Sequence, residues 1–131
     1  MNLLKTASAA IIFFSAAAQA DVALTQQDLL GVWRIDKESV NADGHDARTG
    51  VNTTWNFKND GTFEGISGDP SDKHARIPES RAVLNYSIEN GKLLKQAAAG
   101  RSKYETCAAI SKEGNSLVLK CPNIYFFMTK Q

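Results

Sequence analysis

Two short segments place a histidine beside acidic residues, a combination used by metal sites and by acid-base catalysts. The groups are His45 with Asp43 and Asp46, and His74 with Asp69 and Asp72. Each group falls within one polar stretch of chain, and neither has the ligand spacing of a standard metal site. We interpret both as solvated loop residues and predict neither a metal nor a cofactor.

Catalytic signatures are also missing from the rest of the sequence. There is no Gly-x-Ser-x-Gly motif, and a Ser-His-Asp triad cannot be identified from scattered residues. The carboxylates of Asp36 and Glu38 share one face of an expected strand, where we expect water around them. The glycines are too dispersed to form a phosphate-binding loop. We therefore predict no catalytic residues and a protein that is not an enzyme.

The first 20 residues have the three parts of a secretory signal peptide. Lys5 supplies the basic start, residues 9–14 the apolar core, and Ala18-Gln19-Ala20 the small-residue cleavage site. The apolar run is shorter than the roughly 20 residues that span a bilayer. We expect cleavage after Ala20, a periplasmic or secreted location, and a single domain over residues 21–131.

The charge balance of residues 21–131 excludes one class of partner. Lys5 is the one charged residue before Asp21, so 14 of the 15 basic residues remain beside all 14 acidic ones, and they are spread along the chain. Nucleic-acid binding requires a clustered basic excess. We predict no nucleic-acid partner, no membrane span and a monomer.

The two cysteines, Cys107 and Cys121, predict a disulfide, because exported proteins fold in oxidising compartments. A three-residue loop over Glu113, Gly114 and Asn115 would place the cysteines directly opposite each other on neighbouring strands. A two-residue loop, Gly114-Asn115, would point them to opposite faces unless a bulge intervenes. We predict the disulfide and the three-residue loop.

Short strands separated by polar turns make up most of the chain. Residues 51–58 alternate so that Val51, Thr53, Trp55 and Phe57 share one face. The turn sequences 59–61 and 90–91 are typical of hairpins. A helical turn over 26–30 should precede the first strand, capped by Thr25 and Asp28. The expected strands are 32–38, 51–58, 62–66, 81–88, 92–96, 103–112, 116–121 and 124–129.

Eight sequential strands with short turns predict an all-β fold, an eight-stranded antiparallel up-and-down barrel. The apolar residues 124–128 would be hazardous at an exposed sheet edge, so we expect the last strand to pair with the first. Such a barrel either fills with side chains or holds one small ligand. The candidates to line a pocket for an apolar ligand are Trp55, Phe57, Phe63 and Tyr86.

Gly31-Val32-Trp33, at the start of the first strand and after a short helical turn, resembles the start of lipocalin-like (calycin) proteins. The hairpin sequences 54–63 and 84–93 are similar to those of small bacterial lipocalin-like domains. The resemblance implies that Trp33 closes the bottom of the barrel, with Gly31 as a second structural position. It also implies a non-catalytic binding protein that holds a small apolar ligand.

A second, fainter resemblance gives an alternative function. Residues 98–104 look like the small-residue and basic loop of periplasmic C-type lysozyme inhibitors, which are also eight-stranded barrels. It implies an inhibitor or immunity protein that presents a loop, 67–80 or 98–104, to an enzyme or toxin.

Overall fold

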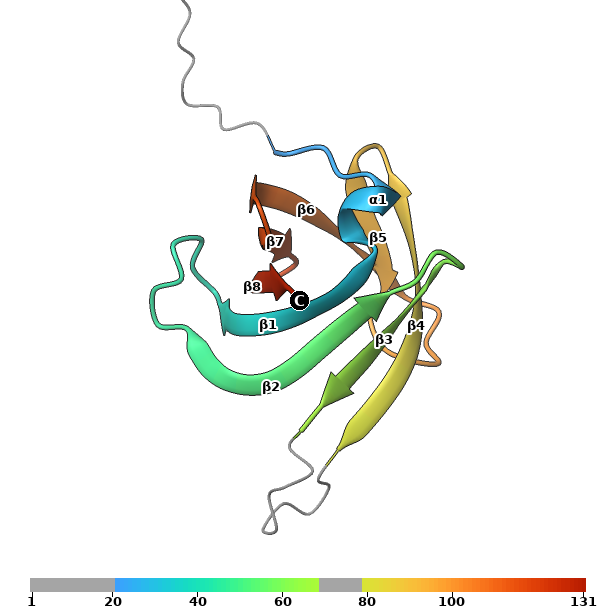
Figure 1. Ribbon diagram of the computed structural model, residues 1–131, viewed down its shortest axis with the longest axis horizontal. Helices are drawn as coiled ribbons and strands as arrows, with labels where there is room; N and C mark the ends of the chain where they lie inside the picture. The colour runs from blue at the N-terminus through green and yellow to red at the C-terminus, as the bar shows by residue number, and fades with distance from the viewer. Residues whose placement is uncertain (1–20, 69–78) are drawn as a thin grey trace, which may run out of the picture.

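The protein forms a closed barrel of eight antiparallel strands with one short helix at one end (Figure 1). The computed structural model describes residues 21–68 and 79–131, so the predicted signal peptide and residues 69–78 of the predicted 67–80 loop lie outside the described residues. Each strand pairs with the next, and β8 pairs with β1, which confirms the predicted up-and-down barrel and its closure. The elements are α1 (Gln26–Leu29), β1 (Gly31–Ser39), β2 (Arg48–Phe57), β3 (Thr62–Ser67), β4 (Ser80–Glu89), β5 (Lys92–Gln96), β6 (Tyr104–Glu113), β7 (Ser116–Cys121) and β8 (Ile124–Lys130).

Turn residues with positive φ connect the strands where the sequence predicts hairpins. Asn90 and Gly91 have φ of 55° and 75° between the paired residues Glu89 and Lys92. Positive φ at both central positions gives a type I′ turn, whose twist matches that of the two strands. The local sequence therefore determines how β4 turns into β5.

The β6–β7 hairpin combines the two registers that the sequence left open. Ala109 pairs with Leu119, but Ser111 pairs with Val118, so Ile110 is an extra residue in β6. The turn is the two-residue Gly114-Asn115, because Glu113 pairs directly with Ser116, and the predicted three-residue loop is wrong. The extra residue shifts the register so that the two cysteines point to the same face of the sheet, and the predicted Cys107–Cys121 disulfide is present.

A second register shift separates two carboxylates that the sequence places on one face. Between Ile35 and Lys37 the pairing of β1 slips, so that Glu38 lies opposite Phe126 of β8. Asp36 instead accepts hydrogen bonds from Arg34 and Thr129. The prediction that Asp36 and Glu38 share a face is wrong, because alternation along a strand does not continue through a bulge.

The helix α1 covers one end of the barrel, which we call the helix end. Thr25 and Asp28 form the predicted capping box, each side chain accepting a hydrogen bond from the backbone of the other residue. Leu29 is fully buried, and its carbonyl oxygen accepts a hydrogen bond from the Trp33 indole. The β1–β2 and β5–β6 loops and the β7–β8 turn lie at the opposite end, which we call the loop end. Among the described residues, no helix is long and apolar enough to cross a membrane.

Candidate functional site

The four aromatic residues predicted to bind a ligand lie together inside the barrel. Phe57 and Phe63 stack with ring centroids 4.8 Å apart, and Tyr86 meets Phe57 edge-on at 5.0 Å. Trp55 lies 5.6 Å from Phe63. The structure therefore brings the predicted residues into one cluster, while their contact with a ligand stays a prediction.

Three members of this cluster form the floor of the interior at the helix end. The Tyr86 hydroxyl donates a hydrogen bond of 2.7 Å to the carbonyl oxygen of Lys58, and Gln26 of α1 approaches the same hydroxyl at 3.3 Å. Phe57 and Phe63 are each only 2% exposed. The rings of Phe57, Phe63 and Tyr86 therefore pack against one another and fill the core at the helix end.

Trp55 extends the aromatic surface toward the loop end. It lies two residues before Phe57 on β2, and its ring centroid is 4.9 Å from that of Phe126, which is only partly buried. Gly65 of β3 lies beside the indole, where a Cβ would make an ordinary van der Waals contact of 3.6 Å with the ring. Trp55 is therefore the member of the cluster best placed to contact a molecule in the loop half of the barrel.

A buried ion pair that was not predicted from the sequence lies next to the Trp55 ring. Lys95 Nζ lies 2.7 Å from Glu105 Oε2, and these residues face each other across β5 and β6. The same Nζ is 5.5 Å from the centre of the Trp55 ring. Alternation could have revealed the pair, since Lys95 follows Leu93 by two residues and Glu105 precedes Cys107 by two.

The Lys95 ammonium is the most deeply buried charged group described. Its side chain is 7% exposed and that of Glu105 is 22% exposed. An ammonium carries three N–H donors. Within residues 21–68 and 79–131, its contacts are one carboxylate oxygen and one indole face. Since buried donors are normally satisfied, this group has hydrogen-bonding capacity left for another acceptor.

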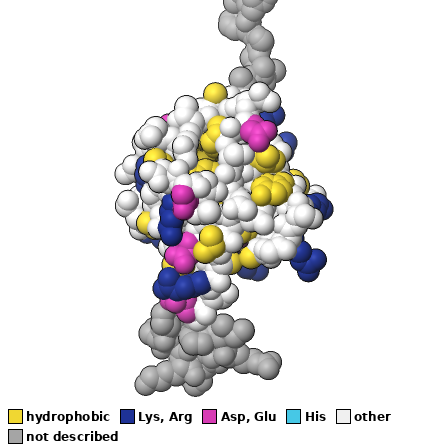
Figure 2. Space-filling view, turned by 90° about the vertical axis from the view of Figure 1, so that its right-hand side faces the viewer, with side chains coloured by type: hydrophobic (Ala, Val, Ile, Leu, Met, Phe, Trp, Pro, Cys, Tyr) yellow, Lys and Arg dark blue, Asp and Glu magenta, His cyan; other side chains and the backbone are white. Residues whose placement is uncertain are grey.

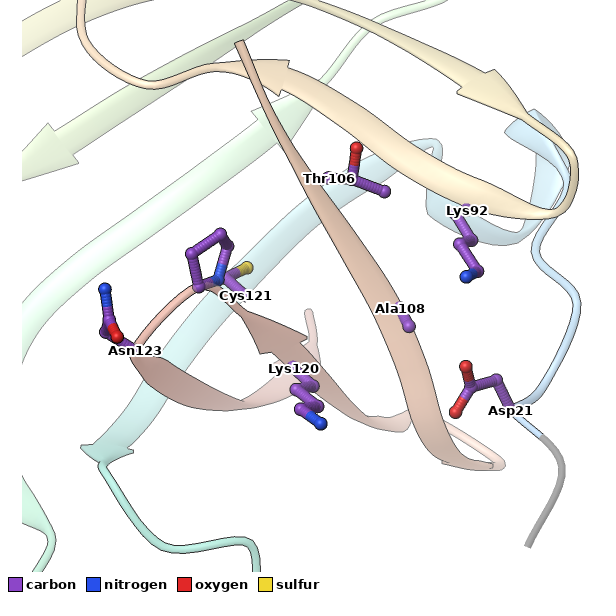
Figure 3. A pocket seen from close by; sticks show the side chains of 8 residues that line it. Asp21, Lys92, Thr106, Ala108, Lys120, Cys121 and Asn123 are labelled. Carbon is purple, nitrogen blue, oxygen red and sulfur yellow. The ribbon is translucent and has the colours of Figure 1, made fainter. Parts of the chain in front are cut away.

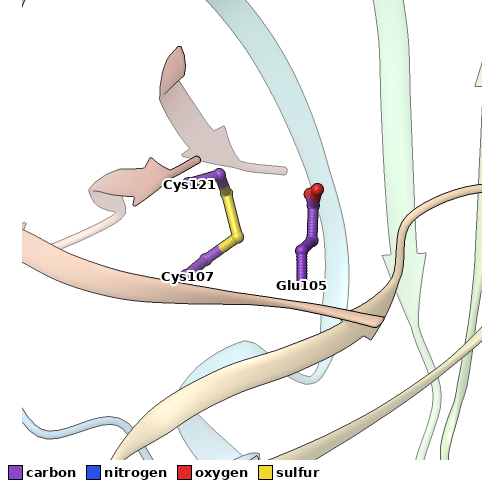
Figure 4. Close-up of side chains that lie close together, drawn as sticks. All are labelled: Glu105, Cys107 and Cys121. Carbon is purple, nitrogen blue, oxygen red and sulfur yellow. A yellow bond between two sulfur atoms is a disulfide. The ribbon is translucent and has the colours of Figure 1, made fainter. Parts of the chain in front are cut away.

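Glu105 also lies beside the disulfide, as Figure 4 shows. Ligand atoms of Glu105, Cys107 and Cys121 lie within 4.8 Å of one another, a grouping that could hold a metal ion if the thiols were free. Both sulfurs are instead joined to each other. The disulfide therefore forms an apolar wall next to the carboxylate and supplies no thiolate ligand.

A groove lies on the outside of the barrel (Figure 3). It encloses about 430 Å³ and is lined by Thr106 and Ala108 of β6, by Lys92 and Lys120, and by Asp21. Thr106 alternates with the inward-facing Glu105 and Cys107, so it points away from the interior. The groove is open to solvent and lined by both polar and apolar groups, and none of the four aromatic residues of the cluster lines it.

The histidine groups do not form a site in the part of the chain that is described. His45 lies in the exposed β1–β2 loop, with Nε2 3.1 Å from an oxygen of its neighbour Asp46. Asp43 accepts a hydrogen bond from the His45 backbone N–H, which is a local turn contact. His74, Asp69 and Asp72 lie outside the described residues. On the face shown in Figure 2, acidic side chains lie beside basic ones, in keeping with the balanced charge of the sequence.

Comparison with known proteins finds similarity in structure but not in sequence. No protein-family description matches the chain, and a search of curated proteins finds no match. A lipocalin-like protein from Bacteroides uniformis ATCC 8492 superimposes with a TM-score of 0.61 at 17% sequence identity, covering 79% of this chain and 99% of that chain. At this identity the match concerns the fold alone. Together with the closed eight-stranded barrel, it shows that the chain has a lipocalin-like fold.

Proposed function

We propose that this chain is an exported, non-catalytic binding protein that holds one small, mainly apolar ligand in the loop half of its barrel. The interior of an eight-stranded antiparallel barrel either fills with side chains or holds one small ligand. The observation that carries the proposal is the difference between the two halves of the interior. Aromatic side chains fill the helix end, whereas Trp55, Phe126 and the Lys95–Glu105 pair present mixed apolar and polar groups toward the loop end.

Export is supported by the signal-peptide pattern of residues 1–20 and by the disulfide. A disulfide between buried cysteines is typical of proteins that fold in an oxidising compartment. A periplasmic or secreted carrier would meet its ligand outside the cytoplasm. A mature chain that begins at Asp21 is the corresponding expectation.

A non-catalytic role is supported by the chemistry of the interior. The ammonium beside the Trp55 ring is paired with a carboxylate, and the cysteines beside that carboxylate are bonded to each other. The cysteine sulfurs, the strongest potential nucleophiles beside the pair, are bonded to each other and are therefore not free to react.

Native mass spectrometry of the protein purified gently from a periplasmic extract tests the proposal. We expect a mature mass beginning at Asp21 with a small molecule bound, which is lost on replacing Trp55 with Leu. Replacing Val83 with Leu is the matched control, because Val83 is 55% exposed on the outer face of β4. A ligand-free wild-type protein that co-purifies with an enzyme or toxin would instead favour the inhibitor alternative, whose 98–104 loop ends at the exposed Tyr104.

A further inference from the structure

We propose that Lys95 and Glu105 form the polar end of the ligand site and select a ligand that is uncharged and carries a hydroxyl or carbonyl oxygen. The inference rests on the proposed function, because it names the ligand class of that same interior site. It starts from the buried ion pair in the barrel. A core of similar volume made from apolar residues is commonly as stable as one with a buried ion pair.

The position of the pair suits contact with a ligand. Lys95 Nζ faces both Glu105 Oε2 at 2.7 Å and the Trp55 ring at 5.5 Å. A molecule that packs its apolar part on Trp55 and Phe126 therefore brings its polar end within reach of the ammonium. The Glu105 side chain is 22% exposed and that of Lys95 is 7% exposed, so solvent reaches the pair mainly at the carboxylate.

The hydrogen-bonding capacity of the pair indicates what it can recognise. The ammonium has donors beyond the one used by Glu105, and an ionised carboxylate accepts several hydrogen bonds. A ligand oxygen can accept from Lys95, and a ligand hydroxyl can also donate to Glu105. Such a ligand satisfies groups that would otherwise be costly to bury.

The charge of the pair favours an uncharged ligand over an ionic one. The ammonium and carboxylate already neutralise each other, so an uncharged ligand leaves the pair neutral. A ligand carboxylate would be attracted to Lys95 but repelled by Glu105, and a ligand amine would be attracted to Glu105 but repelled by Lys95. Because these two terms oppose each other, an ionic ligand gains little from the pair to offset the loss of its own hydration.

Three eight-carbon probes test this selectivity: octan-1-ol, octanoate and octylammonium. Octan-1-ol and octylammonium have the same alkyl chain, and octanoate has one alkyl carbon fewer, which is worth about fourfold in affinity, so a difference of tenfold or more reports the polar end. Isothermal titration calorimetry of the wild-type protein should show a Kd for octan-1-ol that is at least about tenfold lower than the Kd for either ion.

The Glu105→Gln variant should change the preference in a defined direction. It leaves the Lys95 ammonium without its neutralising partner, so the affinity ratio of octanoate to octan-1-ol should rise at least about tenfold. Glu113→Gln is the matched control, because Glu113 lies on the same strand, is exposed at the turn and should leave the ratio unchanged.

The outcomes separate this inference from the proposed function. Wild-type protein that binds octanoate more tightly than octan-1-ol overturns the inference, and this measurement needs no variant to fold. An unchanged ratio in folded Glu105→Gln also overturns it. If none of the three probes binds while mass spectrometry of the extract shows a bound small molecule, the inference fails and the proposed function stands. If the extract also yields no bound molecule, both fail.

Discussion

The indole N–H of Trp33 donates a hydrogen bond of 2.9 Å to the carbonyl oxygen of Leu29, and both side chains are almost completely buried. This bond joins α1 to the first strand of the barrel. A helix of four residues cannot be stable through its own hydrogen bonds, because nucleation is unfavourable. Trp33 therefore links α1 to the barrel at the helix end, while closure of the barrel bottom by Trp33 stays a prediction.

Replacing Trp33 with Phe should lower the free energy of unfolding by about 2 kcal/mol. The change leaves the buried Leu29 carbonyl without its donor, and a smaller ring leaves space in the core. Urea denaturation followed by circular dichroism measures the loss. Val83→Ala, at an exposed site on β4, should change stability by less than about 0.5 kcal/mol. Equal losses of unfolding free energy for the two substitutions would show that the Trp33 indole does not stabilise the fold.

Reduction of the disulfide should lower the melting temperature. The bond joins residues separated by 14 positions, and closing a loop of that length contributes about 3 kcal/mol or less in the chain-entropy account. The Cys107→Ala, Cys121→Ala double variant should melt at a similarly lowered temperature and should not respond to reductant. Identical melting of the wild-type protein with and without reductant would contradict the contribution of the bond.

Removing the charge of Lys95 should destabilise the protein more than removing both charges of the pair. Lys95→Met leaves the Glu105 carboxylate partly buried without its partner, which should cost about 2–4 kcal/mol. The double variant Lys95→Met, Glu105→Leu should lie within about 1 kcal/mol of the wild type, because no unpaired charge remains. Lys92→Met, on the same strand but exposed, is the control. A double variant as unstable as Lys95→Met would argue against this account.

The capping box should make part of the stability depend on pH. The backbone N–H of Thr25 donates to the Asp28 carboxylate, and this bond, together with the nearby Lys112 ammonium, lowers the pKa of Asp28 below its ordinary value of 3.8. Because the folded-state pKa is the lower one, the contribution is complete above the unfolded-state pKa and disappears as the pH falls through the folded-state pKa.

Asp28→Asn should therefore be less stable than the wild type at pH 7 but closer to it at pH 3. Urea midpoints measured at pH 3, 5 and 7 give the comparison. A difference between the two proteins that is the same at pH 3 and pH 7 would show that Asp28 does not act through its charge.

Two glycines with similar backbone conformations should respond differently to substitution by alanine. Gly91 and Gly100 have φ of 75° and 74°, so alanine at either position should cost about 1–2 kcal/mol of backbone strain. A Cβ on Gly91 would lie only 3.2 Å from Ala23, whereas a Cβ on Gly100 would meet nothing within 4 Å. Thermal unfolding should show a larger loss for Gly91→Ala than for Gly100→Ala. Equal losses would mean that the segment around Ala23 moves aside without cost.

Local signals in the sequence determined most of the fold. The turn Asn90-Gly91, the capping pair Thr25 and Asp28 and the alternation along β4 act over a few residues, so their patterns can be read directly from the chain. Alternation along β2, β3 and β4 placed the four aromatic residues of the candidate site inside the barrel.

The tertiary structure decided where the alternation is interrupted and which side chains meet across the barrel. The bulge at Ile110 lets the cysteines face each other across a two-residue turn, and the shift after Ile35 turns Asp36 and Glu38 to different faces. The contact of Lys95 with Trp55 joins strands that are distant in sequence, so no local pattern encodes it. The sequence alone therefore determined a barrel with an aromatic interior, and the tertiary structure brought the Lys95–Glu105 pair to the face of Trp55, because that contact depends on how distant strands are arranged around the barrel.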